Sequence, residues 1–431
     1  MRKPGLILVI CFFANHLLSQ ELNTNTLYSP VTTKQAREER YKYLLDTTIR
    51  QYLKEPLNED NEGLWNDALW SLELLQYKDA FTKTKMTEAW NKAGKLSEYF
   101  QKNLLETTYS LYKTEFKNPV QLLLKSTASI PVFLRCAEYL LRADAATYKP
   151  VIASLIKIKF ANNTSVGLDI LKSRMSNWNK PIVLPSLNYI FRKDFLKGQT
   201  VIYSLHRRSR DYSGIVIIRK PNGDFARNKD GSYFRTSQLA RGITAYPFYI
   251  TNGNTPQGIF KWTGFDHSKL LYIGPTTNLQ MVMPYEAKPS LFFADSALEN
   301  VKWNKGMYAS LLPDSWKNYE GIYESFYAGA IGRYDIIMHG TTIDPLFYKG
   351  KTYYPQTPSL GCLCSYEEWD SSGKRVSSNQ QQIADALEST GSSNGYVVVI
   401  DIDDKKSGIL VDDILKNLWI VENEAIDKKP Q

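Results

Sequence analysis

The chain has 431 residues, enough for two domains, with a hydrophobic content of 43% and a formal net charge of +9. A solvated basic surface accounts for so modest a charge, although the charge also suits an anionic envelope polymer. No run of Lys and Arg with interleaved aromatic residues occurs, so we expect no nucleic-acid partner.

The first residues predict an export signal. Arg2 and Lys3 precede an apolar stretch at 6–14, and residues 17–20 form a cleavage region. The apolar stretch is too short for a membrane-spanning helix, and no later stretch is long enough. We therefore expect residues 1–19 to be a signal peptide. The remaining chain is expected to be exported without spanning a membrane, to the periplasm of a Gram-negative bacterium.

Removal of this segment would leave three cysteines, Cys136, Cys362 and Cys364. An odd number argues against a disulfide framework and for at least one free thiol. Because a free thiol is at risk in an oxidising compartment, a purposeless one is disfavoured. Cys136 shares the apolar face of a helical pattern, so we expect it to be a small core residue.

Residues 20–190 are expected to form an all-α domain of about six helices, as a bundle or a short array. Pro119, Pro131 and Pro150 each precede an apolar run and are expected at helix starts, where no backbone N–H is needed. The residues at 177–185 predict a linker. No residue in this half indicates chemistry, and its aromatic side chains are more typical of packing than of a glycan-binding face.

Residues 191–431 are expected to form a mainly β domain with inserted helices, which makes the whole a multi-domain protein of α and β structure. Short alternating or apolar runs bounded by turn residues carry this prediction. The strands are expected at 214–220, 270–273, 279–283 and 396–402, and helices at 316–326 and 380–387.

One His and one Cys fall close together late in the chain. Residues 336–338 predict a buried strand that presents His339 at its end, and Gly361 permits a tight turn that exposes the thiol of Cys362. A cysteine nucleophile needs a base nearby to form the thiolate, and imidazole is the usual one. The connection 340–361 is long enough to fold back and bring the two together.

Other roles for Cys362 are a buried structural cysteine or a pair with Cys364. A C-x-C pair is poorly spaced for a disulfide and too small alone for a closed zinc site, so no metal is expected. In a strand Cys364 would face the same side as Cys362, and packing is its favoured role. A papain-like or NlpC-like peptidase would place Cys before His in the chain, whereas here His339 comes first.

The H-G-T string at 339–341 and the S-x-G-C string at 359–362 resemble the active-site signature of the L,D-transpeptidases with a YkuD-type catalytic domain. Leu360 and Cys364 stand where that family has His, and Arg or Asn. The string T-P-x-G-x-F at 255–260 is a second resemblance, in the order along the chain that the family has.

The resemblance implies a catalytic group of Cys362, His339, Gly361 and Gly340. Cys362 would be the nucleophile and His339 the base, oriented by the carbonyl of Gly340 or a neighbouring hydroxyl. The backbone N–H groups of Gly361 and Cys362 would bind the oxyanion of a tetrahedral intermediate.

A second group is expected to bind substrate or to support the site. Ser359 would brace the turn, and the hydroxyl of Thr341 could orient the imidazole. Arg333 could pair with a substrate carboxylate or be a surface residue. Tyr353 and Tyr354 could line a peptide groove or pack the loop.

The resemblance implies a peptidoglycan L,D-transpeptidase that joins donor and acceptor stem peptides in 3–3 cross-links through a thioester. It implies no cofactor, and carbapenem-type inhibitors are expected to acylate Cys362. Water in place of the acceptor amine would make an L,D-carboxypeptidase. A non-catalytic peptidoglycan-binding protein is the third reading, and no protein partner is predicted.

Overall fold

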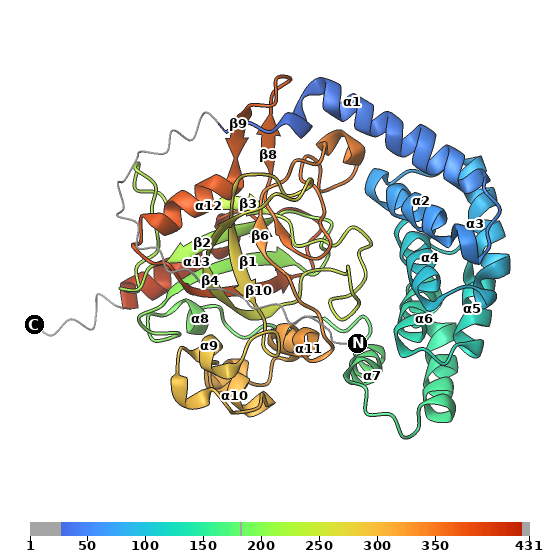
Figure 1. Ribbon diagram of the computed structural model, residues 1–431. Coiled ribbons are helices and arrows are strands. Elements are labelled where there is room, and N and C mark those ends of the chain that lie inside the picture. The colour runs from blue at the N-terminus through green and yellow to red at the C-terminus, as the bar shows by residue number, and fades with distance from the viewer. Residues whose placement is uncertain (1–26, 182, 425–431) are drawn as a thin grey trace, which may run out of the picture.

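The computed structural model describes residues 27–181 and 183–424 (Figure 1). The predicted signal peptide, residues 1–19, lies outside this range. Within it, no helix combines the length and the apolar composition needed to cross a membrane. Many helices and one large mixed sheet are present, so the prediction of a protein with both α and β structure is confirmed.

The N-terminal helices gather beside the sheet, on the right in Figure 1, with α1 leading to them from the hairpin of β8 and β9. The N-cap side chains set several of their starts. Asp79 and Thr82 form a reciprocal capping box at the first turn of α3, and Ser97 accepts from the N–H of Phe100 at 3.1 Å at the start of α4. The helices are α1 (Lys34–Lys42), followed by a π-helical segment (Tyr43–Gln51), α2 (Glu62–Leu75), α3 (Ala80–Lys92), α4 (Glu98–Leu111), α5 (Lys117–Ser126), α6 (Ile130–Lys159) and α7 (Val166–Ser176).

Proline positions agree with the prediction only in part. Pro131 lies at the start of α6 and Pro119 in the first turn of α5, as expected. The prediction for Pro150 is wrong, because Pro150 lies inside α6. The helix breaks earlier, at Asp144 (φ −164°, ψ 86°), whose carboxylate accepts from the N–H of Thr147 at 3.1 Å. This cap starts the second half of α6 and leaves the proline one and a half turns inside it.

The large sheet has eight strands in the order β3-β2-β1-β10-β4-β5-β6-β7. The β1–β10 and β6–β7 pairs are parallel, and the other pairs are antiparallel. A separate antiparallel hairpin is made by β8 and β9. The strands are β1 (Thr200–Arg207), β2 (Gly214–Arg219), β3 (Thr236–Gln238), β4 (Gly258–His267), β5 (Thr277–Val282), β6 (Met338–His339), β7 (Leu363–Cys364), β8 (Glu367–Trp369), β9 (Arg375–Ser378) and β10 (Gly395–Asp403).

Of the strands predicted at 214–220, 270–273, 279–283 and 396–402, three are present, as β2, β5 and β10, and the strand predicted at 336–338 is shortened to β6, which begins at Met338. The strand expected at 270–273 is absent. There the carbonyl of Leu270 accepts from the N–H groups of Ile273 and Gly274, and Gly274 has a φ of +82°, so the apolar run is a tight turn. The helix expected at 380–387 is α12 (Asn379–Glu388), whereas that expected at 316–326 is replaced by two 3-10 turns and α11 (Glu324–Ala330).

Both faces of the sheet are covered. Alternate side chains of β1 and β10 divide between the faces: Ile202 and Val399 pack on the side of α12, and Tyr203 and Val398 on the other. The second face is covered by α8 (Asn188–Phe191), α9 (Pro289–Phe293), α10 (Lys305–Ala309), α11 and α13 (Asp412–Glu424). The core on the α12 side continues without a break into the core of the helical half.

The helical half docks on the segment 243–252, which connects β3 to β4. The ring of Tyr246 stacks on that of Tyr109, with centroids 3.7 Å apart. Its hydroxyl donates to the backbone carbonyls of Leu105 at 3.2 Å and Arg135 at 3.3 Å. The segment is therefore held by both packing and directional bonds.

Two buried carboxylates strengthen this contact. Glu106 pairs with Arg135 at 2.7 Å and also accepts from the side chain of Asn252 at 3.1 Å. The hydroxyl of Tyr249 donates to Glu138 at 2.5 Å. Each carboxylate thus links a helix to the 243–252 segment, and a buried charge is stable only while it keeps its partners.

Arg135→Ala should therefore be strongly destabilising, because it leaves Glu106 buried without its cation. Breaking such a pair costs about 3–5 kcal/mol. Lys172→Ala is the control, since the pair of Lys172 with Asp169 is half exposed and worth at most about 1 kcal/mol. The check is the free energy of unfolding in urea, and equal losses for both variants would contradict the account.

Candidate active site

The segments that carry the two predicted catalytic residues lie at one edge of the sheet. In the parallel β6–β7 pair His339 lies opposite Cys364, and the N–H of Leu363 donates to the carbonyl of Ile337 at 3.0 Å. Cys362 lies just before β7, in the turn that leads into this strand. His339 and Cys364, directly opposite each other in the pair, project to the same face. The connection 340–361 does fold back, as its length predicted.

Ser359 braces the turn that carries the nucleophile. Its hydroxyl accepts from the N–H of Gly361 at 3.0 Å and donates to the carbonyl of Cys362 at 2.8 Å. Gly361 has a φ of +119°, and a side chain there would meet the carbonyl of Gly253 at 2.9 Å as well as the guanidinium of Arg333. Only glycine fits both the backbone angle and the space.

The T-P-x-G-x-F string touches the turn directly. The hydroxyl of Thr255 donates to the carbonyl of Gly361 at 2.9 Å, and that of Cys362 lies at 3.3 Å. Gly258, at φ +126°, starts β4 where a side chain would lie 2.7 Å from the carbonyl of Ile322. The string therefore braces the cysteine turn through Thr255 and, at Gly258, makes a close contact with the segment that leads into α11.

The imidazole of His339 is held in one tautomer. Its Nδ1 lies 2.5 Å from the carbonyl oxygen of Gly340, which can only accept, so Nδ1 donates and Nε2 carries the free lone pair. The side chain is buried, and burial lowers its pKa to about 4, against the opposing effect of the Gly340 carbonyl. At neutral pH the ring is a neutral base.

The thiol of Cys362 is half-buried and is also neutral at rest. Burial raises its pKa to about 11, while the backbone N–H of Ile337 and the charge of Arg333 act in the opposite direction. The carboxylates of Asp335 and Glu286 raise it further. The sulfur donates to the carbonyl of Asp335 at 3.4 Å.

Sγ of Cys362 and the imidazole of His339, both described, make no hydrogen bond to each other. At rest the thiol and the imidazole are therefore both neutral.

The predicted oxyanion donors differ in their availability. The N–H of Gly361 is occupied by Ser359. Among the described residues no acceptor takes the N–H of Cys362. The free donor at the turn is thus that of the nucleophile itself, which is where the charge of a tetrahedral intermediate would develop.

The remaining predicted residues are mostly enclosed. Arg333 is buried and donates to backbone carbonyls, and the hydroxyl of Thr341 accepts from Thr357 at 3.0 Å inside the loop. Tyr353 is buried, whereas the neighbouring Tyr354 is exposed. The thiol of Cys364 is buried against Thr357, as expected for a packing residue.

An exposed apolar rim borders the nucleophile. Leu360, two residues before it, is 51% exposed, and Tyr334, next to Asp335, is 69% exposed. Tyr285 is 46% exposed, and its neighbour Glu286 accepts from the N–H of Asp335 at 2.8 Å, which brings this segment to the rim. Exposed apolar side chains grouped around a nucleophile suit the binding of a peptide.

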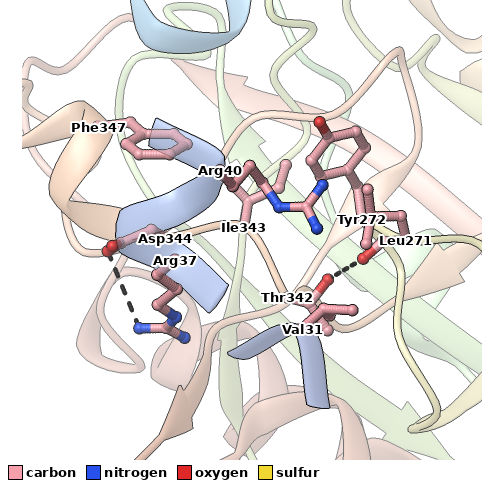
Figure 2. Close-up of a pocket in the computed structure, with 9 residues that line it drawn as sticks. All are labelled: Val31, Arg37, Arg40, Leu271, Tyr272, Thr342, Ile343, Asp344 and Phe347. Atoms are coloured by element: carbon pink, nitrogen blue, oxygen red, sulfur yellow. Dashed lines mark hydrogen bonds and ion pairs between the residues drawn. The ribbon is translucent and has the colours of Figure 1, made fainter. Parts of the chain in front are cut away.

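The small pocket in Figure 2 lies between the N-terminal segment that includes α1 and the loop that follows His339. Arg37 points towards Asp344, with 3.9 Å between the charged atoms, and the guanidinium of Arg40 lies 5.7 Å from the ring centre of Tyr272. Its volume of about 10 Å³ holds one water at most. It is a packing junction between α1 and the loop rather than a substrate site.

Glu367, on β8, is a site residue that the sequence analysis missed. Its carboxylate accepts from the N–H of Thr341 at 2.9 Å and from the hydroxyl of Ser378 at 2.6 Å, and it fills the space that a side chain at Gly340 would need. It thereby fixes the backbone whose carbonyl orients His339. A glutamate among polar neighbours in the sequence gives no signal of this burial.

Burial raises the pKa of Glu367 to about 7, and the hydrogen bonds and Arg375 oppose this rise. Arg375 lies 3.9 Å from the carboxylate, and its charge lowers the pKa of Glu367 by less than burial raises it.

In the described part of the chain, no group of three or more His, Cys, Asp and Glu side chains is arranged to hold a metal ion. Comparison with known proteins gives no match to any family model, curated protein or solved structure. The function is therefore argued from the site.

Glu367→Gln tests the buried carboxylate through its pH dependence. A folded pKa of about 7 against an ordinary value of 4.5 means that the unfolded chain releases this proton first as pH rises. Wild-type stability should therefore fall between about pH 4.5 and 7 by up to about 3 kcal/mol through this group. The variant lacks this loss, so the difference in unfolding free energy between variant and wild type should grow across that window. A constant difference would contradict the assignment.

Proposed function

We propose that this protein is a peptidoglycan L,D-transpeptidase. One observation carries the proposal: the β6–β7 pair places His339 opposite Cys364, two residues after Cys362, and the hydroxyl of Thr255 braces the cysteine turn. The three strings that resemble the family thus contribute to a single site. A cysteine nucleophile with an oriented imidazole and a free backbone donor suits acyl transfer.

The first half-reaction would acylate the cysteine. Nε2 of His339 takes the thiol proton as Sγ bonds to the carbonyl carbon of the third residue, a diamino acid, of a donor tetrapeptide stem. The N–H of Cys362 donates to the oxyanion. The bond to D-alanine then breaks, and His339 returns the proton to the leaving nitrogen, so a thioester remains. The neutral imidazole is ready to accept because its pKa is low.

The second half-reaction would transfer the acyl group. The side-chain amine of an acceptor stem attacks the thioester carbonyl and gives a proton to His339. The bond from carbon to sulfur breaks, and the proton passes to the thiolate. The carboxylates of Asp335 and Glu286, near enough to raise the pKa of the thiol, suit an acceptor that arrives as an ammonium.

The proposal includes the division into a helical domain (20–190) and a catalytic domain (191–431), with export to the periplasm and cell-wall formation as the setting. The exposed rim of Leu360, Tyr334 and Tyr285 would contact the stem peptides. Carbapenem-type inhibitors would acylate the same thiol.

Hydrolysis of the thioester by water is the alternative outcome of the same site, an L,D-carboxypeptidase. One observation favours a third candidate, a non-catalytic peptidoglycan-binding protein: the sulfur of Cys362 donates to Asp335 and not to the imidazole. The products formed from muropeptides distinguish all three.

Purified muropeptides incubated with the protein and analysed by mass spectrometry should yield new 3–3 dimers. Cys362→Ala should form none, and His339→Gln should lose at least about a hundredfold in rate because it lacks the base. Cys364→Ala, which removes a buried thiol outside the dyad, is the matched control and should retain product formation. Tripeptides without dimers would identify a carboxypeptidase. Binding without any product that depends on Cys362 would overturn the enzymatic proposal.

A further inference from the structure

Arg333 is a buried cation whose partners are all neutral. Its guanidinium donates to the carbonyl of Phe248, to that of Asn254 at 2.9 Å and to that of Gly253 at 3.3 Å. No carboxylate of the described residues lies within ion-pair distance of it. Burying a charge without a counter-charge is costly, so such a position calls for an explanation.

The guanidinium lies against the turn that carries the nucleophile. A side chain at Gly361 would run into Nη2 of Arg333, so the cation packs directly on the residue before Cys362. The negative charges that act on Arg333 are those of Cys362 and Glu324, and in return Arg333 favours the ionised form of Cys362. Of these two, the thiolate of Cys362 is the counter-charge that is absent while the thiol is neutral.

We propose that Arg333 is a positioning residue of the nucleophile: a permanent positive charge behind the Cys362 turn that stabilises the thiolate whenever it forms. This role rests on the proposed function, because it matters only if Cys362 reacts.

The charges around Cys362 explain why such a cation is needed. The carboxylates of Asp335 and Glu286 oppose ionisation, and so does burial. His339 is neutral at rest and becomes positive only by taking the thiol proton. The sulfur carries negative charge twice in the reaction, once when it attacks and once when it leaves. Arg333 is positive at both moments.

Arginine suits this position because its side chain donates to several backbone carbonyls at once. A planar guanidinium can donate to several acceptors at once and still stay charged when buried. Its acceptors lie in the segment 248–254, the end of the connection on which the helical half docks through Tyr246 and Tyr249. The helices therefore help to fix the cation behind the nucleophile.

Alkylation of Cys362 in the full chain measures this effect without any assumption about substrate. The chain is alkylated at pH 8, and fragment ions in mass spectrometry then distinguish modified Cys362 from modified Cys136 and Cys364. The thiols of Cys136 and Cys364 are buried. Reaction with iodoacetamide should slow at least about tenfold in Arg333→Gln, since a nearby opposite charge shifts a pKa by about 1–3 units. Arg333→Lys, which keeps the charge, should recover most of the rate.

The ratio of the iodoacetate rate to the iodoacetamide rate adds a readout that a purely structural role would not move. The anionic reagent benefits from the local cation, so the ratio should fall in Arg333→Gln and stay near the wild-type value in Arg333→Lys. Wild-type reactivity in Arg333→Gln, or equal losses in both variants, would overturn the proposal.

Asp335→Asn keeps the test decisive if the arginine variants do not fold. Asp335 has a φ of +56°, which Asn tolerates well, and its carboxylate opposes the thiolate. Alkylation should then be faster than in the wild type, and an unchanged rate would count against electrostatic control of the thiol. Arg333-dependent alkylation without any muropeptide product would overturn the proposed function alone. Muropeptide products with alkylation independent of Arg333 would overturn this inference alone.

Discussion

The parallel pairing of two very short strands, β6 and β7, is the constraint on which the site depends. A parallel pair needs a long connection, and here residues 340–361 supply it. Because the pairing puts His339 opposite Cys364, it also brings the turn that carries Cys362 to the same edge of the sheet as His339. The strands are too short to hold themselves in place. Glu367 beneath Gly340 and Ser359 and Thr255 around the cysteine turn hold their ends.

The helical half helps to hold the same site in place. Its core is continuous with that of one face of the sheet, and it grips the segment 243–252 through Tyr246, Tyr249 and Asn252. That segment runs on to the carbonyls that hold Arg333. Packing that begins in the helices thus ends one residue from Cys362, so the helical half supports the turn that carries this cysteine.

The sequence predicted features that depend on residues close together in the chain, and it missed those that depend on contacts between distant segments. Gly361 and Ser359 are visible because a tight turn favours those residue types, whereas His339 and Cys362 were singled out by their chemistry and by the resemblance, and their roles stay predictions. Glu367 and the environment of Arg333 are invisible, since each acts on backbone that is distant along the chain. The same distinction explains the errors of fold: the cap at Asp144 prevails over Pro150, and the apolar run at 270–273 finds no partner strand.

The central claim is that Cys362 forms a thioester with a donor stem. Intact-mass spectrometry of the full chain mixed with a tetrapeptide stem, quenched in acid without an acceptor, tests it most directly. The account predicts a mass increase equal to the tripeptide acyl group, located on Cys362 and absent from Cys362→Ala. No adduct on a folded wild-type protein at several donor concentrations, or an adduct on another residue, would contradict it.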